Sequence, residues 1–239
     1  MAPKAPPAAS PCVTGSKRGR GFEAPRGLLL DLDGVLVDTR PVMEIAWRAV
    51  QEAHGVDTPF EAYQEHLGRP FDDIMARLGL ADAEEIHRTY TEASASASHR
   101  VQEFEGITDI LLAVAADGWS LGVVTSKPLA RAAPLLARLG CPFATVRAPG
   151  GHGRGKPAPD PILLALIDLG VDPADATYVG DMAVDQEAAR RAGVSYIHAG
   201  WGYGRPMGPS PAVAETPRQL LHLLGVSASN GPFVEGGLL

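Results

Sequence analysis

The stretch LLLDLDGVLVDT, residues 28–39, places two carboxylates, Asp31 and Asp33, at the end of an apolar run and directly before a glycine. An apolar run of this length that ends at a turn signal is typical of a buried parallel strand. Burial would bring both acids to the carboxyl end of that strand, which is the edge where open α/β sheets bind ligands. A lone acidic pair more often caps a helix or faces solvent, so its meaning depends on the rest of the chain.

Three later segments also carry polar side chains at the end of an apolar run or in a loop that cannot be helical. Prolines keep the second of these segments out of helical conformation. The segments are LGVVTSK at 121–127, with Thr125 and Ser126; GKPAPDP at 155–161, with Lys156; and TYVGDMAVD at 177–185, with Asp181 and Asp185.

In this order the four segments, which span residues 28–185, resemble the motifs of the haloacid dehalogenase (HAD) superfamily. The resemblance is closest to phosphoglycolate-phosphatase-like enzymes with a helical (C1-type) cap. It implies an α/β fold, with a three-layer Rossmann-like parallel-sheet core and an inserted α-helical cap domain. It also implies a Mg²⁺-dependent phosphatase that hydrolyses a small phosphorylated metabolite through an aspartyl-phosphate.

The resemblance gives each catalytic motif residue a role. Asp31 would be the nucleophile, and Asp33 would protonate the leaving oxygen and later activate water. Thr125 and Ser126 would bind the phosphoryl oxygens. Lys156 would balance the negative charge of the nucleophile and the phosphate, which otherwise repel each other.

The same resemblance implies a magnesium site built from oxygen ligands, which this hard cation prefers. Asp31 and Asp181 would bind the ion through their carboxylates, and Asp33 through its backbone carbonyl. Asp185 lies one helical turn beyond Asp181, so it can face the same site and bind the ion directly or through water.

Composition agrees with a globular enzyme of the cytoplasm. The chain has 239 residues, 45% of them apolar, and no apolar run approaches the length of a membrane span. The net charge is −7, and the first 26 residues carry five basic residues against one acidic residue, so the remainder is more acidic still. An acidic body argues against nucleic acid as a partner. The sequence leaves the oligomeric state open.

Composition and periodicity divide the chain into a disordered tail at 1–26, an α/β core at 27–39 and 106–225, a helical cap at 40–105 and a flexible tail at 226–239. Helical patterns in the insert lie at 41–54, 59–66, 70–78 and 82–100. The core pattern predicts strands near 119–124, 143–147, 176–180 and 194–198, and helices near 107–117, 129–139, 159–169, 183–192 and 215–224.

A cap that closes over the site would select the substrate. Within it, Arg69 lies between Gly68 and Pro70, in a loop where related caps point a substrate-reading segment at the core. A guanidinium there would bind an anionic or polyhydroxyl group through paired hydrogen bonds, although a loop arginine is as often merely solvated. The aromatic and glycine loop at 201–204 would either line the mouth of the cleft or pack inside the protein.

The residues that the chain contains or lacks distinguish several activities known in this superfamily. Phosphonoacetaldehyde-type hydrolases use a cap lysine, and residues 40–105 contain none. Haloacid dehalogenases lack an acid at the position of Asp33. A β-phosphoglucomutase-like phosphomutase shares the first motif and stays open, as does a phosphoglycolate phosphatase. A non-catalytic partner protein on this fold is less favoured, because every motif residue is present.

A narrower resemblance rests on the cap. EAYQEHLGRPFDDIMARLGL, residues 61–80, is similar to phosphatase-like proteins associated with 3-amino-5-hydroxybenzoate (AHBA) synthesis in ansamycin antibiotic clusters. It implies a sugar or aminosugar phosphate as substrate and a place in antibiotic biosynthesis.

Overall fold

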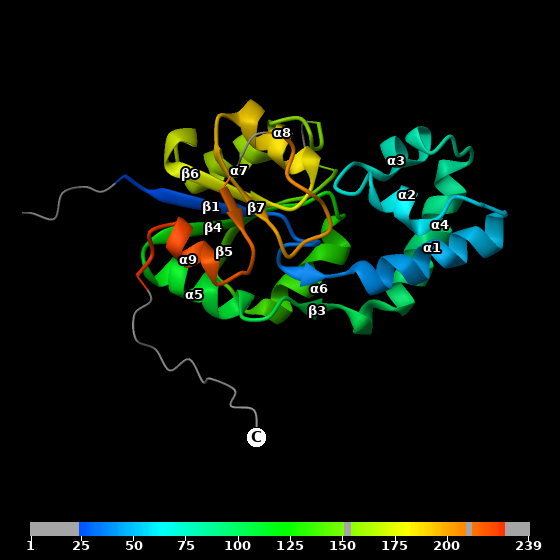
Figure 1. Ribbon diagram of the computed structural model, residues 1–239, viewed down its shortest axis with the longest axis horizontal. Helices are drawn as coiled ribbons and strands as arrows, with labels where there is room; N and C mark the ends of the chain where they lie inside the picture. The colour runs from blue at the N-terminus through cyan, green and yellow to red at the C-terminus, as the bar shows by residue number, and fades with distance from the viewer. Residues whose placement is uncertain (1–23, 151–153, 209–211, 228–239) are drawn as a thin grey trace, which may run out of the picture.

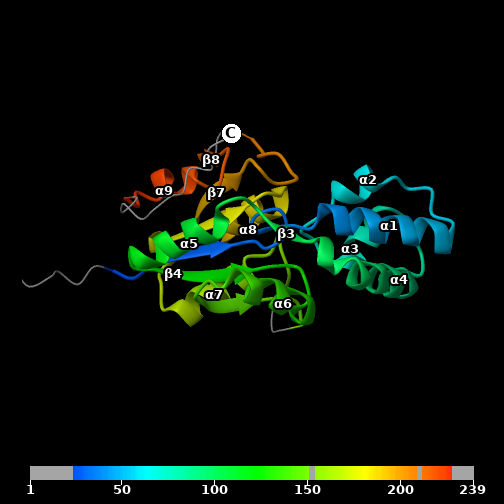
Figure 2. The ribbon, with the colours of Figure 1, turned by 90° about the horizontal axis from the view of Figure 1, so that it is seen from below.

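The computed structural model describes residues 24–150, 154–208 and 212–227. Figures 1 and 2 show a β-sheet flanked by helices and, beyond one end of the sheet, a separate group of helices. Most of the two expected tails, at 1–26 and 226–239, lies outside the described residues. Arg26 already belongs to the first strand, one residue before the expected start of the core.

The sheet has six parallel strands in the order β5-β4-β1-β6-β7-β8. In its register, Leu30 of β1 lies between Val123 and Val179 of the neighbouring strands. The strands are β1 (Arg26–Leu30), β4 (Trp119–Val124), β5 (Phe143–Arg147), β6 (Ala176–Gly180), β7 (Ser195–Ala199) and β8 (Ala212–Ala214).

The strand order reverses at the centre of the sheet. From β1 the chain moves outward to β4 and β5, and it then returns to the other side of β1 with β6 and β7. A crevice forms at such a switch point, outside the carboxyl ends of the strands, and it is where doubly wound sheets bind ligands. Here the two strands at the switch point, β1 and β6, are followed by Asp31 and Asp181.

Helices cover both faces of the sheet. Leu28 and Leu30 belong to an apolar cluster with residues of α5 (Ile107–Ala116), α6 (Leu129–Leu139) and α9 (Gln219–Leu223). Leu29 belongs to a second cluster with residues of α7 (Asp160–Leu169) and α8 (Ala183–Ala192). Successive side chains of a strand point to opposite faces, so β1 is buried on both sides. This confirms the three-layer α/β core.

The separate helices are α1 (Arg40–His54), α2 (Phe60–Gln64), α3 (Phe71–Arg77) and α4 (Ala83–Ser96), followed by a 3₁₀ turn at Ser98–Arg100. They bury an apolar cluster of their own, in which the rings of Trp47 and Tyr63 stack with centroids 4.4 Å apart. Met182 and Val184 of the core also belong to this cluster, so the helices rest on the start of α8.

Two short strands link these helices to the core. β2 (Val37–Asp38) and β3 (Gln102–Glu103) form an antiparallel ribbon through which the chain enters and leaves the helical segment. Strands of two residues are too short to give a periodic pattern, so the sequence did not predict them. We use the name cap for α1 to α4, as the arrangement in Figures 1 and 2 suggests.

The end of the core differs from the sequence prediction in two places. The helix expected at 215–224 starts only at Gln219, because the chain turns at 215–218, around Pro217. The strand β8 was not predicted at all. Among the described residues, no helix combines the length and the apolarity needed to cross a bilayer.

Candidate active site

Asp31 directly follows β1, and its side chain is almost completely buried, with 4% of the residue exposed. Its backbone N–H donates to Val179 O of β6 over 2.9 Å, which extends the sheet pairing by one residue. The Oδ1 atom accepts a hydrogen bond from Leu32 N at 2.8 Å, and it forms an ion pair with Lys156 Nζ at 3.0 Å. Asp31 also lines a cleft between the core and the cap. The carboxylate is therefore fixed through one oxygen and open to the cleft.

Lys156 is buried beneath this carboxylate, with 1% of the residue exposed. Its Nζ lies 2.7 Å from Asp185 Oδ1 and 3.0 Å from Asp31 Oδ1, and it donates to the hydroxyl of Tyr178 at 3.2 Å. Burial by itself would lower the pKa of the ammonium, but the two carboxylates outweigh it and hold this pKa above its usual value. Lys156 is thus a fixed positive charge.

Asp181 follows β6 and is fully buried. Its Oδ2 accepts a hydrogen bond of 2.8 Å from Tyr203 N, whereas Oδ1 is buried and has no hydrogen-bond partner. Three glycines, at 34, 202 and 204, surround the residue: an added Cβ would come within 2.2 to 2.3 Å of Asp181 atoms. An unpartnered buried carboxylate oxygen is costly and calls for a ligand.

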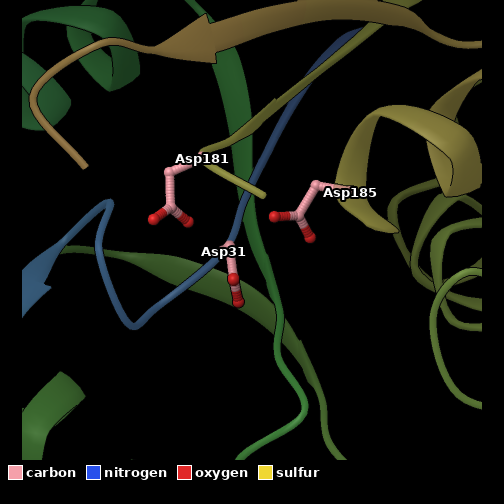
Figure 3. A group of neighbouring side chains, drawn as sticks. All are labelled: Asp31, Asp181 and Asp185. Atoms are coloured by element: carbon pink, nitrogen blue, oxygen red, sulfur yellow. The ribbon is translucent and has the colours of Figure 1, made fainter. Parts of the chain in front are cut away.

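The three carboxylates converge, as Figure 3 shows, and one oxygen of each lies within 4.8 Å of the others. Burial raises the pKa of Asp31 to about 7, with Lys156 opposing the rise and Asp185 and Asp33 adding to it. Burial and the neighbouring carboxylates Asp185 and Asp31 raise the pKa of Asp181 well above its usual value. The three buried acids have only one buried ammonium to offset their charge, so the cluster suits a divalent cation in addition to the lysine.

The three acids are not equivalent in this cluster. Both oxygens of Asp185 are already engaged: Oδ1 with Lys156 at 2.7 Å and Oδ2 with Met182 N at 2.9 Å. The Tyr178 hydroxyl also lies 3.1 Å from Asp185 Oδ1. A cation therefore fits best between Asp31 and Asp181, with Asp185 holding the lysine and the turn into α8.

Substitution of Gly34 by alanine should abolish activity through Asp181. The new Cβ would lie 2.2 Å from Asp181 Oδ2 and displace the carboxylate. Gly118→Ala is a matched control, because both glycines have similar positive φ angles, +84° and +88°, but Gly118 has nothing within 4 Å. Both variants should lose about 1–2 kcal/mol of stability to backbone strain. Urea unfolding should show at least this loss of stability in both variants, with the larger loss in Gly34→Ala, whereas steady-state turnover should be lost in Gly34→Ala alone. Equal turnover in the two variants would contradict the account.

Asp33 lies at the mouth of the site rather than inside the carboxylate cluster. Its Oδ1 forms an ion pair of 3.0 Å with Lys127 Nζ and accepts a hydrogen bond of 2.6 Å from the Thr39 hydroxyl. The side chain is 16% exposed and lines the cleft. Lys127 was not among the predicted site residues. Its only signal was its place directly after the hydroxyl pair at 125–126.

Thr125 follows β4 and also lines the cleft, with 5% of the residue exposed. Ser126 lines the cleft too, but its hydroxyl donates a hydrogen bond of 2.6 Å to Gly68 O of the cap. That bond ties the loop after β4 to the loop that carries Arg69. Arg69 reaches the cleft while its Nη1 pairs with Asp73 Oδ2 at 3.2 Å. The structure thus brings all the predicted site residues to one cleft or to the cluster beneath it.

Tyr203 is a site residue that sequence reasoning did not single out beyond its glycine-rich loop. Its backbone N–H holds Asp181, and its hydroxyl accepts the N–H groups of Thr39 at 2.7 Å and Arg40 at 3.1 Å. The hydroxyl also donates to Asp38 Oδ1 at 3.0 Å. One side chain therefore joins the acidic cluster to the segment where the cap begins.

Comparison with known proteins gives consistent results. Residues 28–199 match the family described as haloacid dehalogenase-like hydrolase. An N-acetylmuramic acid 6-phosphate phosphatase of Pseudomonas aeruginosa is 31% identical over 217 residues, which cover 83% of this chain and 94% of that protein. A phosphoglycolate phosphatase of Cupriavidus necator, plasmid form, is 33% identical over 202 residues, covering 79% and 86%.

Solved structures show the same fold. The crystal structure of CbbY from Rhodobacter sphaeroides in complex with phosphate superposes with a TM-score of 0.69 at 26% identity, covering 82% of this chain and 96% of that one.

Proposed function

The chain belongs to the haloacid dehalogenase-like hydrolase family and is a phosphatase, and we propose that it hydrolyses the phosphate ester of a small metabolite through an aspartyl-phosphate on Asp31. The observation that carries this proposal is the placement of Asp31. Its carboxylate lies at the switch point of the sheet, is held by Lys156 and opens to the cleft. A nucleophile fixed in this way is what covalent phosphoryl transfer requires.

In the first step a carboxylate oxygen of Asp31 attacks the phosphorus. The bond from phosphorus to the leaving oxygen breaks, and Asp33 gives its proton to that oxygen. Lys127 and Thr39 both contact Asp33 Oδ1, so the proton transfer would use the other oxygen, Oδ2. Lys156 offsets the negative charge that Asp31 and the phosphoryl group bring together, and the Thr125 hydroxyl binds a phosphoryl oxygen.

In the second step water attacks the phosphorus of the aspartyl-phosphate. Asp33 takes the proton from this water, the bond between phosphorus and the Asp31 oxygen breaks, and inorganic phosphate is released. The cap covers the cleft with apolar and aromatic residues such as Leu67 and Phe71, which limit the access of other water.

The residues present fit a magnesium ion. Asp31 and Asp181 would hold it, with the unpartnered Asp181 Oδ1 as one ligand atom, and Asp33 would add its backbone carbonyl. Such an ion supplies Lewis acidity and offsets charge on the phosphoryl oxygens. In this proposal Asp185 holds Lys156 and reaches the ion only through water.

Magnesium should stabilise the metal-free protein against heat. A cation that binds only the folded state adds about 2.7 kcal/mol of stability at a concentration 100 times its dissociation constant. We expect the melting temperature to rise with Mg²⁺ in the wild type and not in Asp181→Asn. Asp168→Asn, which alters an exposed acid that is paired with Arg147 and is not part of the carboxylate cluster, serves as the control and should keep the full response. An unchanged melting temperature in the wild type would argue against the metal site.

Release of phosphate from an aryl phosphate, measured with and without Mg²⁺, tests the activity itself. Turnover that requires Mg²⁺ and is lost on chelation supports the proposal. Turnover that is equal without the metal would contradict the cofactor, and no turnover under any condition would contradict the catalytic assignment.

The substrate is a separate question. Among candidates, phosphoglycolate and N-acetylmuramic acid 6-phosphate are the substrates that the relatives' names state. An aminosugar phosphate of an antibiotic pathway rests on the cap sequence at 61–80 alone. A phosphomutase activity would appear as an isomeric sugar phosphate rather than free sugar when a hexose 1-phosphate is supplied. A turnover screen over these esters ranks the candidates.

A further inference from the structure

Arg131, in the first turn of α6, places a positive charge on the wall of the cleft that holds Asp31. The side chain is half-buried, and its Nη2 donates a hydrogen bond of 2.6 Å to Ser94 Oγ of α4. Its guanidinium carbon also lies 5.9 Å from the centroid of the Tyr90 ring. Arg131 therefore extends from the core to the cap, and both of these partners are uncharged.

The other two cations on the cleft wall have carboxylate partners. Lys127 pairs with Asp33 at 3.0 Å, and Arg69 pairs with Asp73 at 3.2 Å. Within the described part of the chain, no carboxylate oxygen lies within 4.0 Å of an Arg131 nitrogen, so this guanidinium has no salt bridge there. A partly desolvated charge that lacks a counter-charge gains more than a paired one when an anion arrives.

The phosphoryl group does not need Arg131 as its cation. Lys156 already serves the carboxylate cluster at the strand ends, from beneath Asp31. Arg131 instead contacts two residues of α4, and it also lines a second hollow with Thr39 and Ser98 on the cap side. Because Arg131 lines the same cleft as Asp31 and contacts the cap, it can meet the alcohol part of an ester whose phosphorus lies at Asp31.

We propose that Arg131 binds a second anionic group on the leaving alcohol, so that the substrates of this phosphatase are phosphate esters that also carry a carboxylate or a second phosphate. This inference rests on the proposed phosphatase function. The planar guanidinium can donate two parallel hydrogen bonds to either anion, and the Tyr90 ring beneath it keeps the plane in place. Arg131 is thus a specificity-determining residue, distinct from the groups that perform the chemistry.

Matched pairs of esters test the proposal, because the two members of each pair differ in the second anion. Phosphoglycolate is compared with 2-hydroxyethyl phosphate, N-acetylmuramic acid 6-phosphate with N-acetylglucosamine 6-phosphate, and fructose 1,6-bisphosphate with fructose 6-phosphate. We expect the wild type to favour the anionic member of at least one pair by about tenfold or more in kcat/KM, the scale of a charge-assisted hydrogen bond. The first two pairs report on a carboxylate, and the third reports on a second phosphate.

Variants then assign the preference to this side chain. Arg131→Met should remove the preference by raising KM for the ester with the second anion, with kcat/KM for the ester that lacks it changed less than about twofold. Ser94→Ala removes the bond to α4 but keeps the guanidinium, so it should keep the preference. Arg138→Met, on the same helix and bonded to Val101 O, is the matched control. Arg131→Lys, which keeps the charge, should retain part of the preference and provides a second variant if Arg131→Met unfolds.

Two results would overturn the proposal. One is a wild type that shows no preference in any pair. The other is an Arg131→Met variant whose kcat/KM falls equally for both members of a pair, which is the result expected if Arg131 only tethers the cap or binds the phosphoryl group. Turnover of p-nitrophenyl phosphate separates this failure from that of the proposed function. If the wild type hydrolyses p-nitrophenyl phosphate, only the role of Arg131 is at stake; if it hydrolyses no ester, the proposed function fails as well.

Discussion

Asp31→Asn should lower kcat by at least about 10⁴-fold while leaving the protein folded. An amide oxygen can still accept the hydrogen bonds from Leu32 N and Lys156 Nζ, so the local structure should survive. The amide cannot attack phosphorus, and the first step is lost. Steady-state release of phosphate and the circular dichroism spectrum together measure the effect.

The control for this prediction is an acid outside the site. Asp117 is exposed and pairs with Arg26 at 3.1 Å, before the start of β4. Asp117→Asn should keep wild-type turnover. Retained turnover in Asp31→Asn would remove the nucleophile from the proposal, even if the enzyme were a phosphatase by another mechanism.

Lys156→Met should destabilise the protein by about 3–5 kcal/mol, because it leaves buried carboxylates without their cation. The ammonium is 1% exposed and lies 2.7 Å from Asp185 and 3.0 Å from Asp31. Methionine is of similar length, so lost packing contributes little. Urea unfolding in the presence of a chelator, with wild type and variant side by side, measures the difference.

The loss should depend on pH in a defined direction. Burial already raises the pKa of Asp31 to about 7, above its value in the unfolded chain, and removal of the lysine raises it further. The folded state then binds more protons than the unfolded state, so stability falls as the pH rises through 7. The deficit of Lys156→Met should be larger at pH 8 than at pH 5.5. A deficit that is the same at both pH values would contradict this account.

Lys127→Met is the matched control, since the structure describes only these two lysines. The Lys127 partner, Asp33, is 16% exposed at the cleft and keeps its hydrogen bond from Thr39. We expect this variant to lose less stability than Lys156→Met, because it takes the cation from one carboxylate that still has a hydrogen-bond donor. If Lys127→Met lost as much stability as Lys156→Met, the charge balance of the buried cluster would not explain the effect of Lys156→Met.

The sequence predicted which residues gather and why. Asp31, Thr125 and Asp181 each end an apolar run, which suits the carboxyl edge of a parallel sheet, and the order of the motifs, through their resemblance to a known family, implied that the three residues share one site. The first helix of the cap was also predictable, because Pro41 lies in its first turn and Gly55 ends it with a φ of 63°. Local signals of this kind can be read from the sequence without knowledge of the rest of the fold.

Contacts between distant segments could not be predicted in the same way. Tyr203 reaches Thr39 across 164 positions of the chain, and Ser126 reaches Gly68 across 58. The ribbon at 37–38 and 102–103 has two residues in each strand, too few for a pattern. The partners of Arg131 likewise depend on how the cap lies against α6, which no periodicity encodes. These contacts decide the geometry around the leaving group, and so they decide the substrate.

The central claim, a covalent phosphoryl group on Asp31, is tested most directly by a pre-steady-state burst in Asp33→Asn. p-Nitrophenolate leaves without an acid, whereas hydrolysis of the aspartyl-phosphate needs Asp33 as a base. We predict a rapid release of nitrophenolate equal to the enzyme concentration, followed by slow turnover. The matching ³²P label should be found on the peptide that contains Asp31 and be removed by hydroxylamine. Absence of both the burst and the label, or a label on another residue, would contradict the claim.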